Sequence, residues 1–248
     1  MRYTLKTISA LLSYPDAALQ SALPELQAAV ETEGLLPEDA RRALRDFMQE
    51  VAEGDLYDLQ ERYVLLFDRT RSLSLHLFEH VHGESRDRGQ AMVDLAALYD
   101  RHDLAIGTSE LPDFIPLFLE FLSAIPQTEA RQHLSETVHI LEAIRQRLEK
   151  RQSSYASVFS ALQSLAQEQP DAEVLKAILS APDDDPNDLV ALDAAWLDEE
   201  VKFGPSSDAA CDTDGLAAKI RAGRRPAPDM PVQPTLRPVV THTPSNRA

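Results

Sequence analysis

The chain has 248 residues, and its 41 acidic and 24 basic side chains give a formal net charge of −17. Such a charge disfavours nucleic acid and anionic membrane surfaces, and it favours a basic partner such as an arginine-bearing peptide. The single cysteine, Cys211, excludes an intrachain disulfide and a cysteine-rich metal site.

The length allows one large domain, or a domain with a tail. No stretch approaches the roughly 18 consecutive apolar residues that a membrane-spanning helix requires. Near the N-terminus, the apolar run from Ile8 to Leu12 is interrupted by Ser9 and is too short for a signal peptide. We therefore predict neither a signal peptide nor a membrane-spanning helix.

Apolar residues recur at helical spacing along most of the chain, and glycine is scarce, with 8 residues. We expect an all-α fold, a compact helical bundle over residues 1–180. Tyr14-Pro15 should stop the first helix, Gly54 should end the second, and Asp55 should cap the third. The expected helices cover residues 5–12, 36–54, 56–67, 88–104, 112–125, 128–152, 154–167 and 172–180, of which 128–152 is the longest.

Composition changes near Ala181. Residues 183–200 carry eight acidic side chains and no basic one, and they include Trp196. Residues 219–248 carry six basic side chains and one acidic one, among many prolines. We expect an acidic segment over 181–205 and a disordered Pro/Arg-rich tail over 206–248.

The stretch from His76 to His80 spells H-x-x-E-H, a zinc-peptidase pattern. On a helix, His76 and His80 would share one face, and Glu79 would serve as the base. This pattern leaves a small zinc hydrolase open as one interpretation. Against it, short patterns arise by chance in helical sequences, no third ligand is evident, and the chain offers no strands for such a site.

The residues that follow form a polar corner between two expected helices. Apolar Leu75, Phe78 and Val81 lie beside it, and a corner that is both apolar and charged suits the binding of another chain. Its charged side chains are expected to form internal ion pairs, with Glu84 and Arg88 at i, i+4 spacing. The predicted structural corner consists of His82, Glu84, Arg86, Asp87 and Arg88.

Several stretches of the sequence resemble the NarJ family of assembly chaperones for respiratory nitrate reductase. The most specific block covers residues 58–95, and residues 109–122 also match, with a Pro-Asp element shared by the wider TorD/DmsD group. Residues 12–15 and 193–204 resemble the N-terminal and C-terminal elements of the family. The resemblance covers roughly residues 5–205.

The resemblance implies a cytoplasmic, all-helical, non-enzymatic protein without a cofactor of its own. Members bind the catalytic, molybdenum-bearing subunit of nitrate reductase through its N-terminal segment and keep it competent for cofactor insertion before it docks on the membrane. Proteins that deliver the molybdenum cofactor are further expected partners. A chaperone for another molybdoenzyme is an alternative within the same class.

The matched blocks suggest a groove for the client peptide. Glu61 and Glu79 are candidates to pair with client cations, and His76 and His80 to make binding sensitive to pH. Burial in the core is the competing interpretation for Tyr63 and Phe67, as is an ordinary helix start for Pro112-Asp113. The predicted client-binding residues are Tyr57, Glu61, Tyr63, Phe67, His76, Glu79, His80, Val81, Pro112, Asp113 and Glu120.

Overall fold

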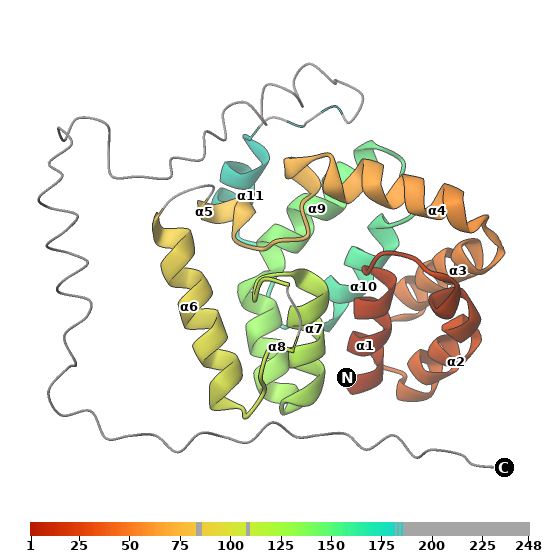
Figure 1. Cartoon of the computed structure of the whole chain (residues 1–248), viewed down its shortest axis with the longest axis horizontal. Coiled ribbons are helices and arrows are strands. Elements are labelled where there is room, and N and C mark those ends of the chain that lie inside the picture. The colour runs from red at the N-terminus through yellow and green to blue at the C-terminus, as the bar shows by residue number, and fades with distance from the viewer. Residues whose placement is uncertain (83–85, 108–109, 182, 184, 186–248) are drawn as a thin grey trace, which may run out of the picture. The chain divides into compact units, whose positions relative to one another are not determined.

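The computed structural model describes residues 1–82, 86–107 and 110–181, together with residues 183 and 185. In these ranges the chain is helical, and one isolated antiparallel bridge joins His76 to Phe114. Helix α1 packs against α2 and α7, and α10 packs against α3 and α9 (Figure 1). The elements are α1 (Arg2–Leu11), α2 (Ala17–Glu33), α3 (Glu38–Glu53), α4 (Leu56–Tyr63), η1 (Val64–Asp68), η2 (Arg71–Leu73), α5 (Glu79–His82), α6 (Arg86–Arg101), α7 (Ile115–Ala124), α8 (Gln127–Glu136), α9 (Val138–Lys150), α10 (Ala156–Leu165) and α11 (Ala172–Leu179).

The all-α prediction is confirmed for the described residues, and most helices lie where periodicity placed them. Helix α2, which the sequence reading missed, begins after Asp16, whose side chain accepts a hydrogen bond from the Leu19 amide. It ends at Gly34, which has a φ of 61°. Since side chains other than glycine rarely adopt that conformation, the glycine closes this helix at low cost.

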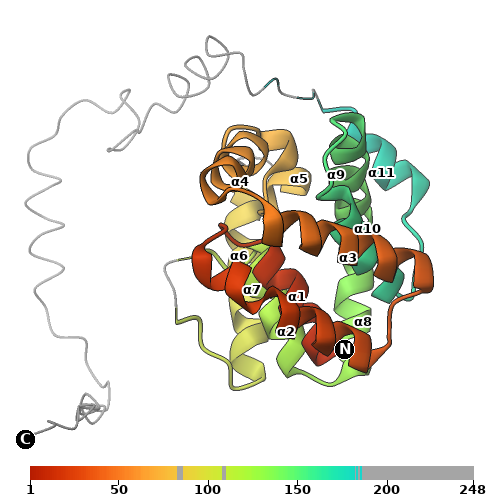
Figure 2. The ribbon, with the colours of Figure 1, turned by 90° about the vertical axis from the view of Figure 1, so that its right-hand side faces the viewer.

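The predicted single helix over 128–152 is wrong. The structure divides this range into α8 and α9 at Thr137, which has a φ of −100° and a ψ of −1°. The Thr137 hydroxyl donates to the Leu134 carbonyl, and such a local hydrogen bond competes with regular helix geometry. Helix α9 then packs beside α11 (Figure 2).

The expected cap of α4 is confirmed, because the Asp55 carboxylate accepts from the amides of Tyr57 and Asp58. The helix continues directly into η1, a π-helical turn. Tyr63 and Phe67 point into the core, where their ring centroids lie 5.0 Å apart and Phe67 meets Tyr155 at the same distance. The all-round apolar character of this stretch thus reflects burial.

Between η1 and α5 the chain forms a segment that we call the connector, residues 70–78. It contains only the short turn η2, yet six of its nine residues are less than a tenth exposed. Buried irregular backbone is costly unless its polar groups find partners, and here several of the partners come from distant parts of the chain. The buried connector residues are Thr70, Ser72, Leu73, Ser74, Leu75 and Leu77.

No helix in the described part of the chain is long and apolar enough to cross a membrane. The predicted acidic segment and Pro/Arg-rich tail lie almost wholly outside the described residues, as do Trp196 and Cys211.

The carboxylate of Glu33, at the end of α2, fastens the start of α1. It accepts from the terminal ammonium of Met1 at 2.8 Å, from the Thr4 hydroxyl at 2.6 Å, and from the amides of Tyr3 and Thr4. Burial alone would raise the pKa of Glu33, but these hydrogen bonds outweigh it and lower the pKa to about 2. The carboxylate therefore satisfies amides that a helix start leaves without partners.

We expect Glu33→Gln to lower the free energy of unfolding at pH 7 by roughly 2 kcal/mol, because the amide cannot replace the charged acceptor. Since the folded-state pKa is depressed, this contribution is present above the ordinary value of 4.5 and disappears as pH falls toward about 2. Urea unfolding at pH 7 and pH 3 measures the difference. Glu31→Gln, at an exposed ion pair with Arg45, is the control and should change little.

Candidate functional site

Asp113, two residues before the start of α7, is fully buried and contacts the connector. One carboxylate oxygen lies 3.1 Å from Nδ1 of His76, and the other accepts from the Phe78 amide at 3.1 Å. Its backbone carbonyl also accepts from the Leu77 amide at 3.0 Å, while the Ile115 amide donates to the Leu75 carbonyl at 2.8 Å. A single residue thus ties the connector to the start of α7.

The geometry behind the zinc interpretation is wrong. His76 lies in the connector, and α5 begins only at Glu79, so His76 and His80 are not neighbours on one helix. Nδ1 of His76 faces Asp113, and Nε2 of His80 lies 2.8 Å from the Ser74 carbonyl. Within the described residues, no group of three or more His, Cys, Asp or Glu side chains is placed to hold a metal ion.

The two histidines have opposite electrostatic environments. The hydrogen bond with Asp113 raises the pKa of His76, against the opposing effect of burial. Burial lowers the pKa of His80, because the charged imidazolium would lose its hydration. His80 therefore serves as a neutral donor to the connector backbone, while His76 pairs with a carboxylate.

Glu79 and Arg88 connect the two helices of the corner. An Arg88 guanidinium nitrogen donates to the Glu79 carboxylate at 3.0 Å, and both side chains are partly exposed. Glu79, predicted to pair with a client cation, thus already has an internal partner. Val81 beside it is 53% exposed. Glu84 lies outside the described residues, as do the side chains of His82, Arg86 and Asp87.

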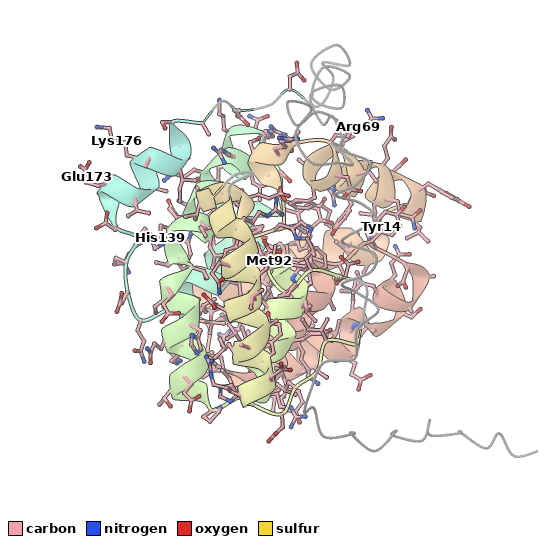
Figure 3. All side chains as sticks on the ribbon, turned by 60° about the vertical axis from the view of Figure 1, so that its left-hand side comes forward. Tyr14, Arg69, Met92, His139, Glu173 and Lys176 are labelled. Carbon is pink, nitrogen blue, oxygen red and sulfur yellow. The ribbon has the colours of Figure 1, made fainter. Side chains whose placement is uncertain are left out.

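A second group of predicted residues lies on the outer face of α4. Tyr57 is 80% exposed, and Glu61, one helical turn later, is also exposed. The Gln60 amide between them donates to the Pro15 carbonyl at 2.9 Å, which brings this face beside the turn after α1. Tyr14 in that turn, which is labelled in Figure 3, is 52% exposed. Its ring stands edge-on to the ring of Tyr63, with centroids 5.6 Å apart.

We call this surface the α4 face, defined by Tyr14, Tyr57 and Glu61. Beneath it, the Tyr63 hydroxyl donates to the Leu12 carbonyl at 2.9 Å. Burial, followed by the negative charge of Asp68, raises the pKa of Tyr63. The α4 face thus combines two exposed aromatic rings with the exposed carboxylate of Glu61.

The remaining predicted residues lie elsewhere. Pro112 does not begin a helix, since α7 starts three residues later at Ile115 and the proline in its first turn is Pro116. The Pro112 carbonyl accepts from the Tyr99 hydroxyl at 2.6 Å. Glu120 is exposed and lines a groove of about 350 Å³ beside Arg2 and Lys6 of α1.

Sequence reasoning missed Arg147, which is 5% exposed on α9. Its guanidinium donates to the Ser72 carbonyl at 2.8 Å and to the Ile178 carbonyl at 3.0 Å. The sequence contains an indication that Arg147 is buried. This arginine follows Ile144 by three residues and directly precedes Leu148 in the apolar stripe of its helix. A buried arginine in such a stripe indicates distant partners.

A family model described as the nitrate reductase delta subunit matches residues 15–161. The chain belongs to this family. It is 44% identical, over 88% of its own length and 91% of the relative's, to the nitrate reductase molybdenum cofactor assembly chaperone NarJ of Escherichia coli K12.

Two further relatives carry related descriptions. The probable nitrate reductase molybdenum cofactor assembly chaperone NarW of Escherichia coli K12 is 39% identical, with 86% of this chain and 88% of that protein aligned. The probable chaperone NarJ of Bacillus subtilis is 31% identical, over 64% of this chain and 85% of the relative. The family resemblance seen in the sequence is therefore confirmed.

The hydrogen bond between Asp113 and His76 affects both the pKa of His76 and the stability of the fold. We expect Asp113→Asn to return the pKa of His76 toward its ordinary value of 6.5 and to destabilise the fold by roughly 2 kcal/mol, because a charged acceptor is lost. Since the folded-state pKa of His76 is raised, its contribution is complete below 6.5 and is lost as pH rises through the folded value.

Titration of the histidine ring signals by NMR measures the pKa, and urea unfolding measures stability. Asp100→Asn, on the exposed side of α6, is the matched control. An unchanged His76 titration in the Asp113→Asn protein would contradict the assigned pairing.

Proposed function

We propose that this chain is an assembly chaperone that binds the catalytic, molybdenum-bearing subunit of a nitrate reductase and keeps it competent for insertion of the molybdenum cofactor. The observation that carries the proposal is the 44% identity to Escherichia coli NarJ over nearly the full length of both proteins. The match of the family model to residues 15–161 supports the same assignment.

The surface chemistry supports a role in peptide binding. The α4 face presents two exposed tyrosines beside Glu61, and the whole chain carries a net charge of −17. Tyrosine offers a large apolar ring with a polar tip, and such residues dominate many interfaces. The Glu61 carboxylate and the negative net charge attract a basic segment and speed its encounter with the protein. We propose that the N-terminal segment of the client lies across this face.

In this proposal the protein acts by binding, in the cytoplasm, without a catalytic step. The H-x-x-E-H residues support a structural role, because the imidazoles of His76 and His80 engage Asp113 and the Ser74 carbonyl. The corner and the α4 face are joined by the connector. In chain order the connector follows Tyr57 and Glu61 and precedes Glu79, and it includes His76, another of the predicted client-binding residues.

Binding to a synthetic peptide tests the proposed function. The peptide copies the N-terminus of the nitrate reductase catalytic subunit from the same genome, and native mass spectrometry and calorimetry measure stoichiometry and affinity. We expect one peptide to bind each chain. Peptides from the catalytic subunits of other molybdoenzymes serve as competitors, and tighter binding of one of them would reassign the client.

The α4 face should carry the affinity. We expect Tyr57→Ala to weaken peptide binding about tenfold, and Glu61→Gln to weaken it about threefold with a smaller dependence on salt. Tyr3→Ala is the matched control, because Tyr3 is 57% exposed on the outer side of α1. Equal affinities for the wild-type and Tyr57→Ala proteins would remove this face from the binding site.

A further inference from the structure

Besides its contacts with Asp113, the connector is bound by side chains of α9 and of residues after α11. The Ser72 carbonyl accepts from the buried Arg147 of α9, which also donates to the Ile178 carbonyl in the last turn of α11. One guanidinium therefore joins the connector to the last described helix. Because both acceptors are buried backbone carbonyls, the loss of this donor would remove a charge-assisted hydrogen bond from each of them, at a cost in stability.

A carboxylate that follows α11 completes the contact. One oxygen of Asp183 accepts from an Arg151 guanidinium nitrogen at 2.8 Å and from the Ser72 hydroxyl at 3.2 Å. Its other oxygen accepts from the Lys150 ammonium at 3.1 Å. We call these four residues, Ser72, Lys150, Arg151 and Asp183, the clasp.

The chemistry of the clasp favours a charged Asp183. Burial alone would raise its pKa, but the hydrogen bonds from Arg151 and Lys150 outweigh this effect and lower the pKa. Its side chain is 23% exposed, so the pair is only partly screened by solvent. Lys150 is 72% exposed, which makes Arg151 the stronger of the two cationic partners.

We propose that Asp183 is a positioning residue for the connector. Through the clasp, Asp183 holds residues 70–78 in the arrangement that joins the α4 face to the corner. The Asp183 carboxylate accepts from the Ser72 hydroxyl, and Arg147 donates to the carbonyl of the same residue. The consequence for client affinity rests on the proposed function. The consequence for the order of the connector does not.

Hydrogen–deuterium exchange of the full chain tests the clasp. We expect Asp183→Asn to speed exchange of the connector amides, including those of Ser74 and Leu77, about fivefold, the effect of losing a partly exposed ion pair. Asp183→Glu keeps the charge and should restore slow exchange. Glu173→Gln is the matched control, since Glu173 points outward from α11 (Figure 3).

Peptide affinity, measured on the same four proteins, separates the clasp from a general loss of stability. We expect Asp183→Asn to weaken client-peptide binding about threefold to fivefold at a temperature where all four proteins remain folded. Identical exchange of residues 70–78 in the wild-type and Asp183→Asn proteins would overturn the proposal, as would faster exchange spread over every helix.

Failure of the two proposals is distinguishable. If the wild-type chain binds no client peptide but Asp183→Asn still speeds connector exchange, the proposed function fails and the clasp stands. If the peptide binds and exchange is unchanged, the clasp fails and the proposed function stands.

Discussion

The conformation of the connector and of the start of α7 depends on the buried carboxylate of Asp113. Its two oxygens are buried, and they accept hydrogen bonds from His76 and from the Phe78 amide of a connector that has almost no regular structure. A charged group in the core is tolerated only when donors surround it. The same donors would be orphaned without it, so the connector and the start of α7 stabilise each other.

The connector gives this all-helical fold its irregular feature. A helix forms its backbone hydrogen bonds internally. This segment instead forms hydrogen bonds with α7, with α9 and with Asp183 after α11. These hydrogen bonds make its conformation sensitive to side chains far away in the sequence. In the proposed chaperone, that sensitivity would let distant parts of the chain adjust the surface that holds the client.

The charge of the chain and its exposed aromatic rings act at different distances. A net charge of −17 attracts a basic segment from afar and is screened by salt. The rings of Tyr14 and Tyr57 act only on contact, where they remove apolar surface from water. The salt dependence of peptide binding and its sensitivity to Tyr57→Ala therefore report separate steps of recognition.

The sequence by itself determined the helical class, the cap at Asp55 and the family, because each of these follows from local spacing or from long matched blocks. It left two interpretations of Tyr63 and Phe67, burial in the core and contact with a client. Only the tertiary structure decided that His76 leaves the helix for Asp113, that Thr137 divides the long helix, and that Glu120 lies beside α1. The hydrogen-bond partners of Arg147 and Asp183 likewise could not be predicted from the sequence. These outcomes depend on which distant groups satisfy buried polar atoms, and periodicity along one chain carries no record of such pairings.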